Sequence, residues 1–320
     1  MASIATVAGY PQFAGQTAGG GKYTPEIFSQ KILTKFYLNT CLMEIANTSY
    51  EGEIKNRGDK VIIRTIPEMT IRDYVKGQDL VYESPAAAEI ELEINKAKYY
   101  GARIDKIDKL QNDIDLMGMW ADDAAQQMKI TVERDVFANF YADANASNVG
   151  NTAGKISSAY VLGTDATPIN LHTGATSGQD VNVIDAIMYA ESALSEQDVP
   201  EDDQRWIILP TWACMLLQTS DLRRADSLGS PANQDILRNG KLGRLGQFTI
   251  FRSNNLPKTA DGETIIPFGH KSALTFATQL TDTETLPHPT SFGTLLRGLQ
   301  VYGYKVIKPE ALGYMVAEKK

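Results

Sequence analysis

Three glycines at every third position, interleaved with basic side chains, come nearest in this sequence to a phosphate-binding loop. The stretch LRNGKLGRLGQFTIF at residues 237–251 contains them: Gly240, Gly243, Gly246, Arg238, Lys241 and Arg244. A phosphate cradle places its glycines between a strand and the N-terminus of a helix, whose amides face the anion. Here a helix-like segment, residues 231–239, precedes the glycines and a strand-like FTIF follows. The order therefore predicts a structural turn from helix to strand rather than a phosphate site.

The histidines and cysteines give no support for catalysis or metal binding. His172, His270 and His288 lie far apart, and none has a second ligand at the spacing of a zinc motif. Cys214 lies among apolar residues in TWACMLL, where a core thiol is expected, and Cys41 is the only other cysteine. No G-x-S-x-G elbow occurs in the sequence. We therefore expect no catalytic, cofactor-binding or metal site, and a protein that is not an enzyme.

The composition is that of a folded protein with an acidic balance. The 320 residues are 43% hydrophobic, and 39 acidic against 31 basic side chains give a formal net charge of −8. A dedicated nucleic-acid binder normally has the opposite sign or a concentrated basic patch. The sequence has no uninterrupted apolar segment of membrane-spanning length, and two cysteines favour a reduced, cytoplasmic setting.

The first hundred residues predict an arm, a helix and a long hairpin. Residues 1–23 are small and polar, and Thr24-Pro25 has the types of an N-cap and first helical residue for a helix to about Ala46. Short β-rich runs then occupy residues 50–100, where AEIELEIN alternates apolar and acidic side chains with a period of two. An isolated hairpin is marginal in water, so this excursion needs another surface to lie on.

The middle of the chain predicts one long helix followed by a long loop. Apolar residues recur at near-helical spacing through residues 105–143, and an unbroken helix there would measure roughly 55–60 Å. Gly118 is the expected point of bending or interruption. Residues 144–180 are rich in Ala, Ser, Thr, Asn and Gly and predict a loop, after which Asp180 would cap a helix ending near Ser195.

The remainder predicts a mixed α+β protein. RWIILP is expected to be a buried strand, TWACMLLQTSDL a short helix, and GETIIPFGH and ALTFATQL further strands. The tail, residues 298–318, predicts a strand, a turn at Pro309 and another strand. This order lacks the βαβ rhythm of a doubly wound parallel sheet.

Four segments together resemble the major capsid proteins of tailed bacteriophages, the Hong Kong 97-type family. They are NTSYEGEIKNRGDKVIIRTIP, the long helix IDKIDKLQNDIDLMGMWADDAAQQMKITVERDV, LRNGKLGRLGQFTIFRSNNLP and the terminal GLQVYGYKVIKPEALGYMVA. The resemblance covers roughly residues 24–320. It implies an α+β capsid fold with an N-terminal arm at 1–48, an extended β-hairpin loop at 49–98, a peripheral domain with a spine helix at 99–145 and 288–320, and an axial domain at 146–287.

The same resemblance implies a structural function. Such a subunit self-assembles into hexamers and pentamers of the icosahedral head that encloses double-stranded DNA, so the chain would be found in the virion after assembly in the host cytoplasm. The implied partners are further copies, a portal, a decoration protein and, because the arm before Thr24 is short, a separate scaffolding protein. The hairpin supplies the candidate contacts between subunits: Arg57, Arg64, Arg72, Tyr74, Lys76, Asp79, Tyr82 and Glu83.

Two alternatives remain at this stage. An encapsulin-like nanocompartment shell would have the same architecture and enclose cargo enzymes instead of DNA. A soluble enzyme with a site assembled from dispersed residues belongs to a different class, and a stable small oligomer with an enclosed pocket would favour it.

Overall fold

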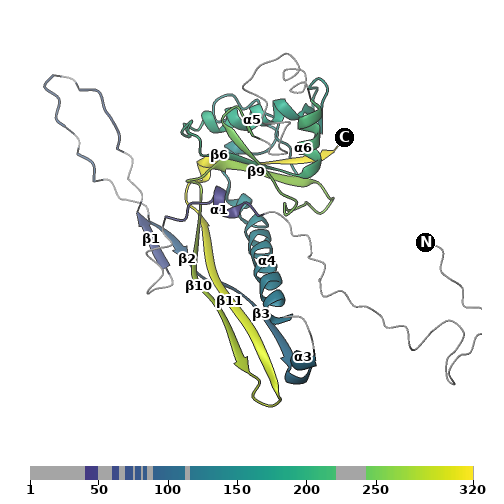
Figure 1. The fold of residues 1–320 in the computed structure, drawn as a ribbon. Helices are drawn as coiled ribbons and strands as arrows, with labels where there is room; N and C mark the ends of the chain where they lie inside the picture. Colours follow the sequence, from purple (N-terminus) through teal and green to yellow (C-terminus); the bar gives the residue numbers. More distant parts are fainter. Residues whose placement is uncertain are drawn as a thin grey trace, which may run out of the picture.

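The protein consists of two bodies joined end to end, with a hairpin projecting from one side (Figure 1). The structure is a computed structural model that describes residues 40–49, 60–64, 69–74, 76–80, 82–84, 89–111, 116–220 and 243–319. We call the upper part, built on a seven-stranded sheet, the compact body. The lower part, in which a long helix lies along a three-stranded sheet, is called the elongated body.

The compact body is a mixed sheet with helices packed on it. Its strand order is β5-β4-β12-β9-β6-β8-β7. The strands are β4 (Ile169–His172), β5 (Asp180–Asn182), β6 (Arg205–Leu209), β7 (Arg244–Leu245), β8 (Phe248–Arg252), β9 (Thr264–His270) and β12 (Leu312–Lys319). All residues of the central strands β6 and β9 are buried, which agrees with the apolar runs that predicted both strands.

Two helices of the compact body agree with their predicted positions. They are α5 (Val183–Ser195) and α6 (Thr211–Thr219), the latter directly after Pro210. The predicted cap of α5 is wrong, because Asp180 lies in β5 and the N-cap is Asn182. The Asn182 side-chain oxygen accepts a hydrogen bond from the Ile184 N–H at 2.9 Å. Both residue types cap helices well, so the pattern alone could not choose between them.

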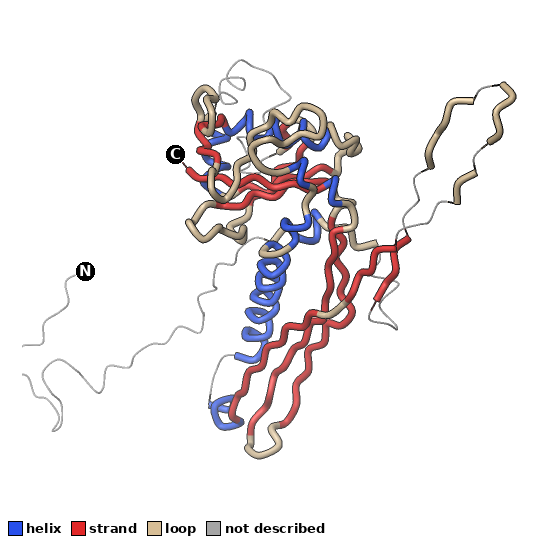
Figure 2. The backbone as a smooth tube through the Cα atoms, turned by 180° about the vertical axis from the view of Figure 1, so that it is seen from behind, coloured by secondary structure: helices blue, strands red, loops and turns tan. Residues whose placement is uncertain are grey.

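The elongated body is a three-stranded antiparallel sheet with a helix along one face (Figure 2). Its elements are β3 (Lys96–Asp105), β10 (Leu274–Pro287), β11 (Gly293–Val306), α3 (Lys106–Gln111) and α4 (Leu116–Phe137). Successive residues of a strand face opposite sides of a sheet. Tyr302 and Leu296 of β11 share the face that α4 covers and are buried, whereas Tyr99 of β3 lies on the other face and is exposed.

The prediction of one helix from 105 to 143 is wrong at both ends. Asp105 belongs to β3, the described helical residues are those of α3 and α4, and residues 112–115 lie outside the described residues. Gly118 lies within the first turn of α4 and does not interrupt it. The helix ends at Phe137, where the Asn139 side-chain amide donates to the Asp135 carbonyl oxygen at 2.8 Å, and a 3₁₀ turn, η1 (Phe140–Asp143), follows.

Residues 144–180 contain more regular structure than the predicted loop. A second 3₁₀ turn, η2 (Ala146–Asn148), and strands β4 and β5 occur there. Strand β4 is held by β12 from the C-terminal end of the chain, in parallel register with Ala317 opposite Ile169. Local composition cannot reveal a strand whose partner is about 150 residues away.

The C-terminal tail follows the predicted strand, turn and strand. Strand β11 leads into a 3₁₀ turn, η3 (Pro309–Ala311), and then into β12. The two strands belong to different bodies, since β11 pairs with β10 and β3 while β12 pairs with β9 and β4. The short turn at Pro309 is therefore one of the connections between the bodies.

A carboxylate holds the loop before β4. Glu196, just after α5, accepts hydrogen bonds from the backbone N–H groups of Ser157, at 3.0 Å, and Ile156, at 2.7 Å. These bonds favour the ionised form and hold the pKa of Glu196 at about 2, below the ordinary glutamate value of about 4.3.

Replacing this carboxylate gives a stability difference that depends on pH. Because the folded-state pKa is lowered, the stabilisation is fully present above the unfolded pKa of about 4.3 and is lost as the pH falls towards 2. We expect Glu196→Gln to have a lower thermal unfolding midpoint than the wild type at pH 7. The two midpoints should converge as the pH is lowered from 4.5, and a gap that stays constant across that range would contradict this role.

Candidate assembly surface

The projecting hairpin is anchored to the elongated body by its own small core. Strands β1 (Lys60–Arg64) and β2 (Glu89–Glu93) are antiparallel, with Val61 opposite Leu92 and Ile63 opposite Ile90. The side chains of Ile63 and Leu92 are buried together with Ile94 and with Ala277 of β10. The alternation of apolar and charged residues gives the hairpin one buried and one wet face, as the period of two predicted.

Ion pairs cross the wet face of the hairpin. Lys60 Nζ lies 3.3 Å from a Glu91 carboxylate oxygen, and Arg64 Nε lies 4.0 Å from one of Glu89. Both pairs are exposed, and exposed pairs contribute about 0–1 kcal/mol. Burial of the Ile63 and Leu92 side chains is therefore the main attachment of the hairpin.

Beyond these strands, the loop carries large apolar side chains into solvent. Five of them are 62–95% exposed: Met69, Ile71, Tyr74, Leu80 and Tyr82. Figure 1 shows the loop reaching away from both bodies. An ion pair between Arg72 and Glu83 links its two limbs. We call these five residues the loop apolar set.

Exposure of these apolar side chains to water is unfavourable in free energy, and burial against another molecule would relieve it. Burying one side chain of this size gains about 1.5–3 kcal/mol, so burial of several would supply much of the free energy of a stable interface. Exposed apolar surface on a folded protein can mark a binding surface. The loop apolar set is therefore a candidate contact surface.

The predicted contact residues are mostly exposed on this loop. Arg57 lies outside the described residues. Arg64 ends β1 beside Glu89, and Arg72 is brought together with Glu83. The remaining four are exposed along the loop: Tyr74, Lys76, Asp79 and Tyr82.

The sequence prediction missed Met69, Ile71 and Leu80, which carry more of the apolar surface than the charged candidates do. Their signal was present in the sequence. Large apolar residues recur there in a stretch too short of apolar partners to form its own core.

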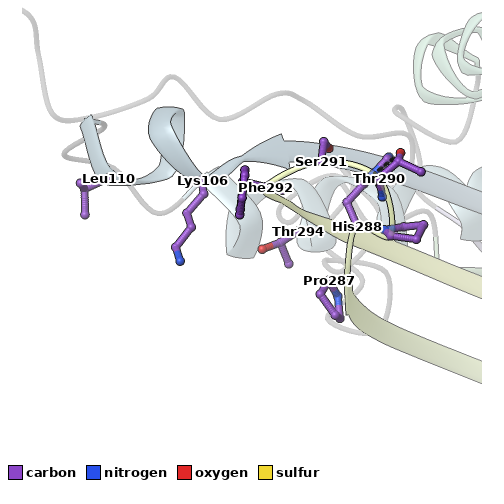
Figure 3. A pocket seen from close by; sticks show the side chains of 10 residues that line it. Lys106, Leu110, Pro287, His288, Thr290, Ser291, Phe292 and Thr294 are labelled. Carbon is purple, nitrogen blue, oxygen red and sulfur yellow. Dashed lines mark hydrogen bonds between the residues drawn. The ribbon is translucent and has the colours of Figure 1, made fainter.

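The far tip of the elongated body bears a second exposed apolar area (Figure 3). An open hollow of about 850 Å³ lies between α3 and the turn from β10 to β11, and its lining includes Lys106, Leu110 and residues 287–294. Leu110 and Phe292 are highly exposed, and the Lys106 N–H donates to the Phe292 carbonyl oxygen at 2.8 Å. The open shape and the apolar rim resemble a contact surface more than an enclosed substrate pocket.

The described part of the glycine and basic stretch forms a tight hairpin. Gly246 lies in the turn between β7 and β8 with φ +57°, a left-handed conformation that favours glycine. The next N–H, of Gln247, donates to a Glu191 carboxylate oxygen at 3.3 Å, and Arg244 is paired with Asp203. The turn leads into a strand and binds carboxylates of its own chain. This agrees with a structural turn; the preceding helix-like segment lies outside the described residues.

Both cysteines and His270 are buried within the fold. Burial raises the pKa of the Cys214 thiol to about 12 and also raises that of Cys41, which lies beside Glu133. His270 Nε2 lies 2.8 Å from an Asp202 carboxylate oxygen, and its Nδ1 accepts from both the hydroxyl and the N–H of Ser272. The hydrogen bonds of the imidazole therefore stabilise the turn between β9 and β10.

Among the described residues, no group of His, Cys, Asp and Glu has a metal-binding arrangement. Within the same part of the chain, no helix is long and apolar enough to span a bilayer.

The subunit thus combines a long helix on a three-stranded sheet, a compact mixed body and a projecting hairpin with an apolar loop. A family model described as phage capsid protein matches residues 90–314, which is more than two thirds of the chain. The chain belongs to the phage capsid protein family. No curated protein matches it.

Solved structures similar to this capsid protein come from several phages. A chain from Mycobacterium phage Che8 is 24% identical with a TM-score of 0.70, covering 92% of this chain and 97% of that one. The capsid structure of the cyanophage P-SCSP1u is 17% identical with a TM-score of 0.66, covering 94% and 96%. The mature capsid of bacteriophage PhiM1 is 14% identical with a TM-score of 0.61, covering 95% and 94%.

These findings decide between the alternatives raised by the sequence. The fold is that of the Hong Kong 97-type phage capsid subunits, and the chain is a major capsid protein, a structural component of the virion. The nanocompartment alternative is not favoured. Capsid proteins act as many copies, so the loop apolar set and the tip hollow are candidate surfaces for assembly into a multimeric shell.

Proposed function

We propose that this capsid protein self-assembles into hexamers and pentamers that close an icosahedral head around double-stranded DNA. The observation that carries the proposal is the loop apolar set, five large side chains that remain exposed in the described part of a single copy. A neighbouring copy that covers them would supply the free energy of assembly. Obligate interfaces of this kind commonly bury about 2,000 Å² or more.

The domain roles follow the family pattern. Residues 1–48 would form the arm, 49–98 the extended loop, 99–145 and 288–320 the peripheral domain, and 146–287 the axial domain. Residues 1–39 of the arm lie outside the described residues. The strand pairing supports two changes of boundary: β10 joins the peripheral domain through β11, and β12 joins the axial domain through β9.

The hairpin contact residues keep their proposed role. Arg64, Lys76 and Asp79 would form the charged rim of the interface, around a centre made by the loop apolar set. Arg57 is proposed on sequence grounds alone. The Arg72–Glu83 pair would hold the limbs of the loop together.

Further partners are proposed from the function of such a shell. A scaffolding protein would guide curvature, a portal would admit the genome, and a decoration protein would bind the assembled lattice. Assembly would take place in the host cytoplasm. The tip hollow, with Leu110 and Phe292 exposed, is proposed as a second contact with neighbouring copies.

We expect the shell to enclose the DNA without binding it tightly. The net charge of −8 argues against strong electrostatic attraction between duplex DNA and the chain as a whole.

Particles from infected cells, treated with nuclease before and after disruption, provide the test. DNA that is protected only while the shell is intact is the predicted result. Particles that contain protein cargo and no protected DNA would contradict this function.

A further inference from the structure

Three consecutive residues near the end of α4 bind partners outside the helix, and Glu133 and Arg134 share the partner Asn255. Side chains one residue apart on a helix point about 100° apart, so together these three reach more than one element. Glu133 faces the junction between the bodies, Arg134 Nε donates to the Asn255 side-chain oxygen at 3.2 Å, and Asp135 faces the three-stranded sheet. This turn of α4 therefore connects the helix to both bodies.

Asp135 fastens α4 to the sheet of the elongated body. Its Oδ2 accepts from Lys96 Nζ at 2.8 Å and from the Tyr302 hydroxyl at 2.9 Å. Burial opposes ionisation of Asp135, but these hydrogen bonds outweigh it and the pKa of the carboxyl is lowered. Helix and sheet are thus held together as one unit, and the connection to the compact body depends on other residues.

Glu133 is a buried carboxylate that accepts from two separate segments. It is only 1% exposed. Its Oε2 accepts from the N–H groups of Cys41, at 2.6 Å, and Leu42, at 3.0 Å. Its Oε1 accepts from the Asn255 side-chain amide at 2.8 Å and from the Ser253 hydroxyl at 3.4 Å. One side chain of the elongated body thus binds both the N-terminal segment and the compact body.

The N-terminal segment that Glu133 binds lies across the junction of the two bodies (Figure 1). The short helix α1 (Leu42–Ile45) begins there, and Glu133 caps it in place of the Cys41 side chain. Ile45 and Ala46 are completely buried in the main core. Asn47 continues as a bridge to the start of β10, since its N–H donates to the Leu274 carbonyl at 2.8 Å.

We infer that Glu133 is a latch that couples the N-terminal segment to the angle between the two bodies. A change in the position of residues 40–42 removes two of the hydrogen bonds that fix the carboxylate. The carboxylate is then fixed only by its bonds to the loop after β8, which carries Ser253 and Asn255, so its orientation against that loop is less restricted. The effect on the subunit depends only on these contacts, whereas an effect on shell curvature also rests on the proposed function.

The latch requires a carboxylate in particular. Four donors converge on two acceptor oxygens, and an ionised glutamate has acceptor sites for all of them. Glutamine has nearly the same shape but one acceptor oxygen, and its amide nitrogen only donates. Glu133→Gln can therefore accept on one side only, while it retains the volume of the core.

Hydrogen exchange of the purified subunit tests the latch without requiring assembly. For Glu133→Gln we expect exchange to rise about tenfold or more at the amides of residues 41–46, since hydrogen bonds to a charged group are lost. Exchange in α5 and β6 should stay unchanged. The matched control is Glu44→Gln, which removes an exposed carboxylate from α1 itself. Wild-type exchange both at residues 41–46 and at residues 253–255 in the Glu133 variant would overturn the inference.

Coupling is tested from the opposite side by Asn255→Ala, which also provides a second variant if Glu133→Gln does not fold. This change lies in the compact body, yet we expect exchange at Cys41 and Leu42 to rise several-fold because the shared carboxylate loses a partner that orients it. A rise confined to residues near 255 would show a local contact and contradict the latch.

Shell geometry provides a third readout. If the proposed function holds, shells of Glu133→Gln should vary more in diameter than wild-type shells. Increased exchange at residues 41–46 in a protein whose wild type forms no shell would sustain the latch and count against the proposed function.

Discussion

Deleting residues 67–86 is expected to leave a folded subunit that forms no closed shell. The deletion removes all five members of the loop apolar set and leaves β1 and β2 joined by a four-residue connection, a length that hairpins accept. The buried contacts of Ile63 and Leu92 stay in place, so the hairpin base should remain on the elongated body. Sedimentation velocity should find monomers or small oligomers in place of shells.

The control for this deletion is a variant that retains the loop apolar set with only small changes to two of its side chains. The double substitution Ile71→Val and Tyr82→Phe should still assemble. A thermal unfolding midpoint close to that of the wild type would confirm that the deleted subunit is folded. Normal shells from the deletion variant would refute the assignment of this loop to contacts between copies.

Gly303→Ala is expected to displace the hairpin and reduce assembly strongly. Gly303 in β11 lies where the end of β2 crosses the sheet, and a Cβ there would lie 2.3 Å from the Glu93 carbonyl oxygen and 2.9 Å from Ile94 Cα. Both are backbone atoms, so the hairpin base must move away. Movement would open the small core formed by Ile63 and Leu92 and shift the loop by a larger distance at its tip.

Gly101→Ala is the matched control, because Gly101 lies on the neighbouring strand β3 and its added Cβ would meet its nearest neighbour at 3.9 Å. Assembly yield measured by light scattering should fall at least tenfold for Gly303→Ala and remain near wild type for Gly101→Ala. Equal yields for the two variants would mean that the position of the hairpin base on the three-stranded sheet does not determine assembly.

The elements that the sequence predicted correctly are those with a strong local pattern. Alternation of apolar residues and glutamates identified β2, and unbroken apolar runs identified the buried strands β6 and β9. The end of α5 near Ser195 was also correct. In each case the buried side chains belong to one short segment of the chain, so the local pattern contains the information.

Features that depend on distant residues could not be predicted in the same way. Strand β12 follows β11 of the three-stranded sheet but pairs in the seven-stranded sheet, which no local pattern indicates. Glu133 belongs to a run of charged and polar residues in α4 that resembles a solvated face, yet its carboxylate is buried by segments about 90 and 120 residues away. Its role depends entirely on tertiary contacts.

The sequence predicted where the candidate contact surface lies on the chain, but it identified only some of the residues that form it. Charged and aromatic residues of the loop were chosen, and Tyr74 and Tyr82 are indeed exposed. Met69, Ile71 and Leu80 were also present in that stretch of the sequence, but the structure was needed to show that their side chains are exposed. Exposure is a property of the fold, and apolar residues in a sequence are by default expected in a core.

Electron cryo-microscopy of particles from infected cells would show directly whether neighbouring copies cover the loop apolar set. We expect a closed shell built from this chain, with rings of five and six subunits in which the loop apolar set of each subunit is covered by a neighbour. A shell in which Ile71 and Tyr82 face solvent, or particles that lack the chain, would contradict it.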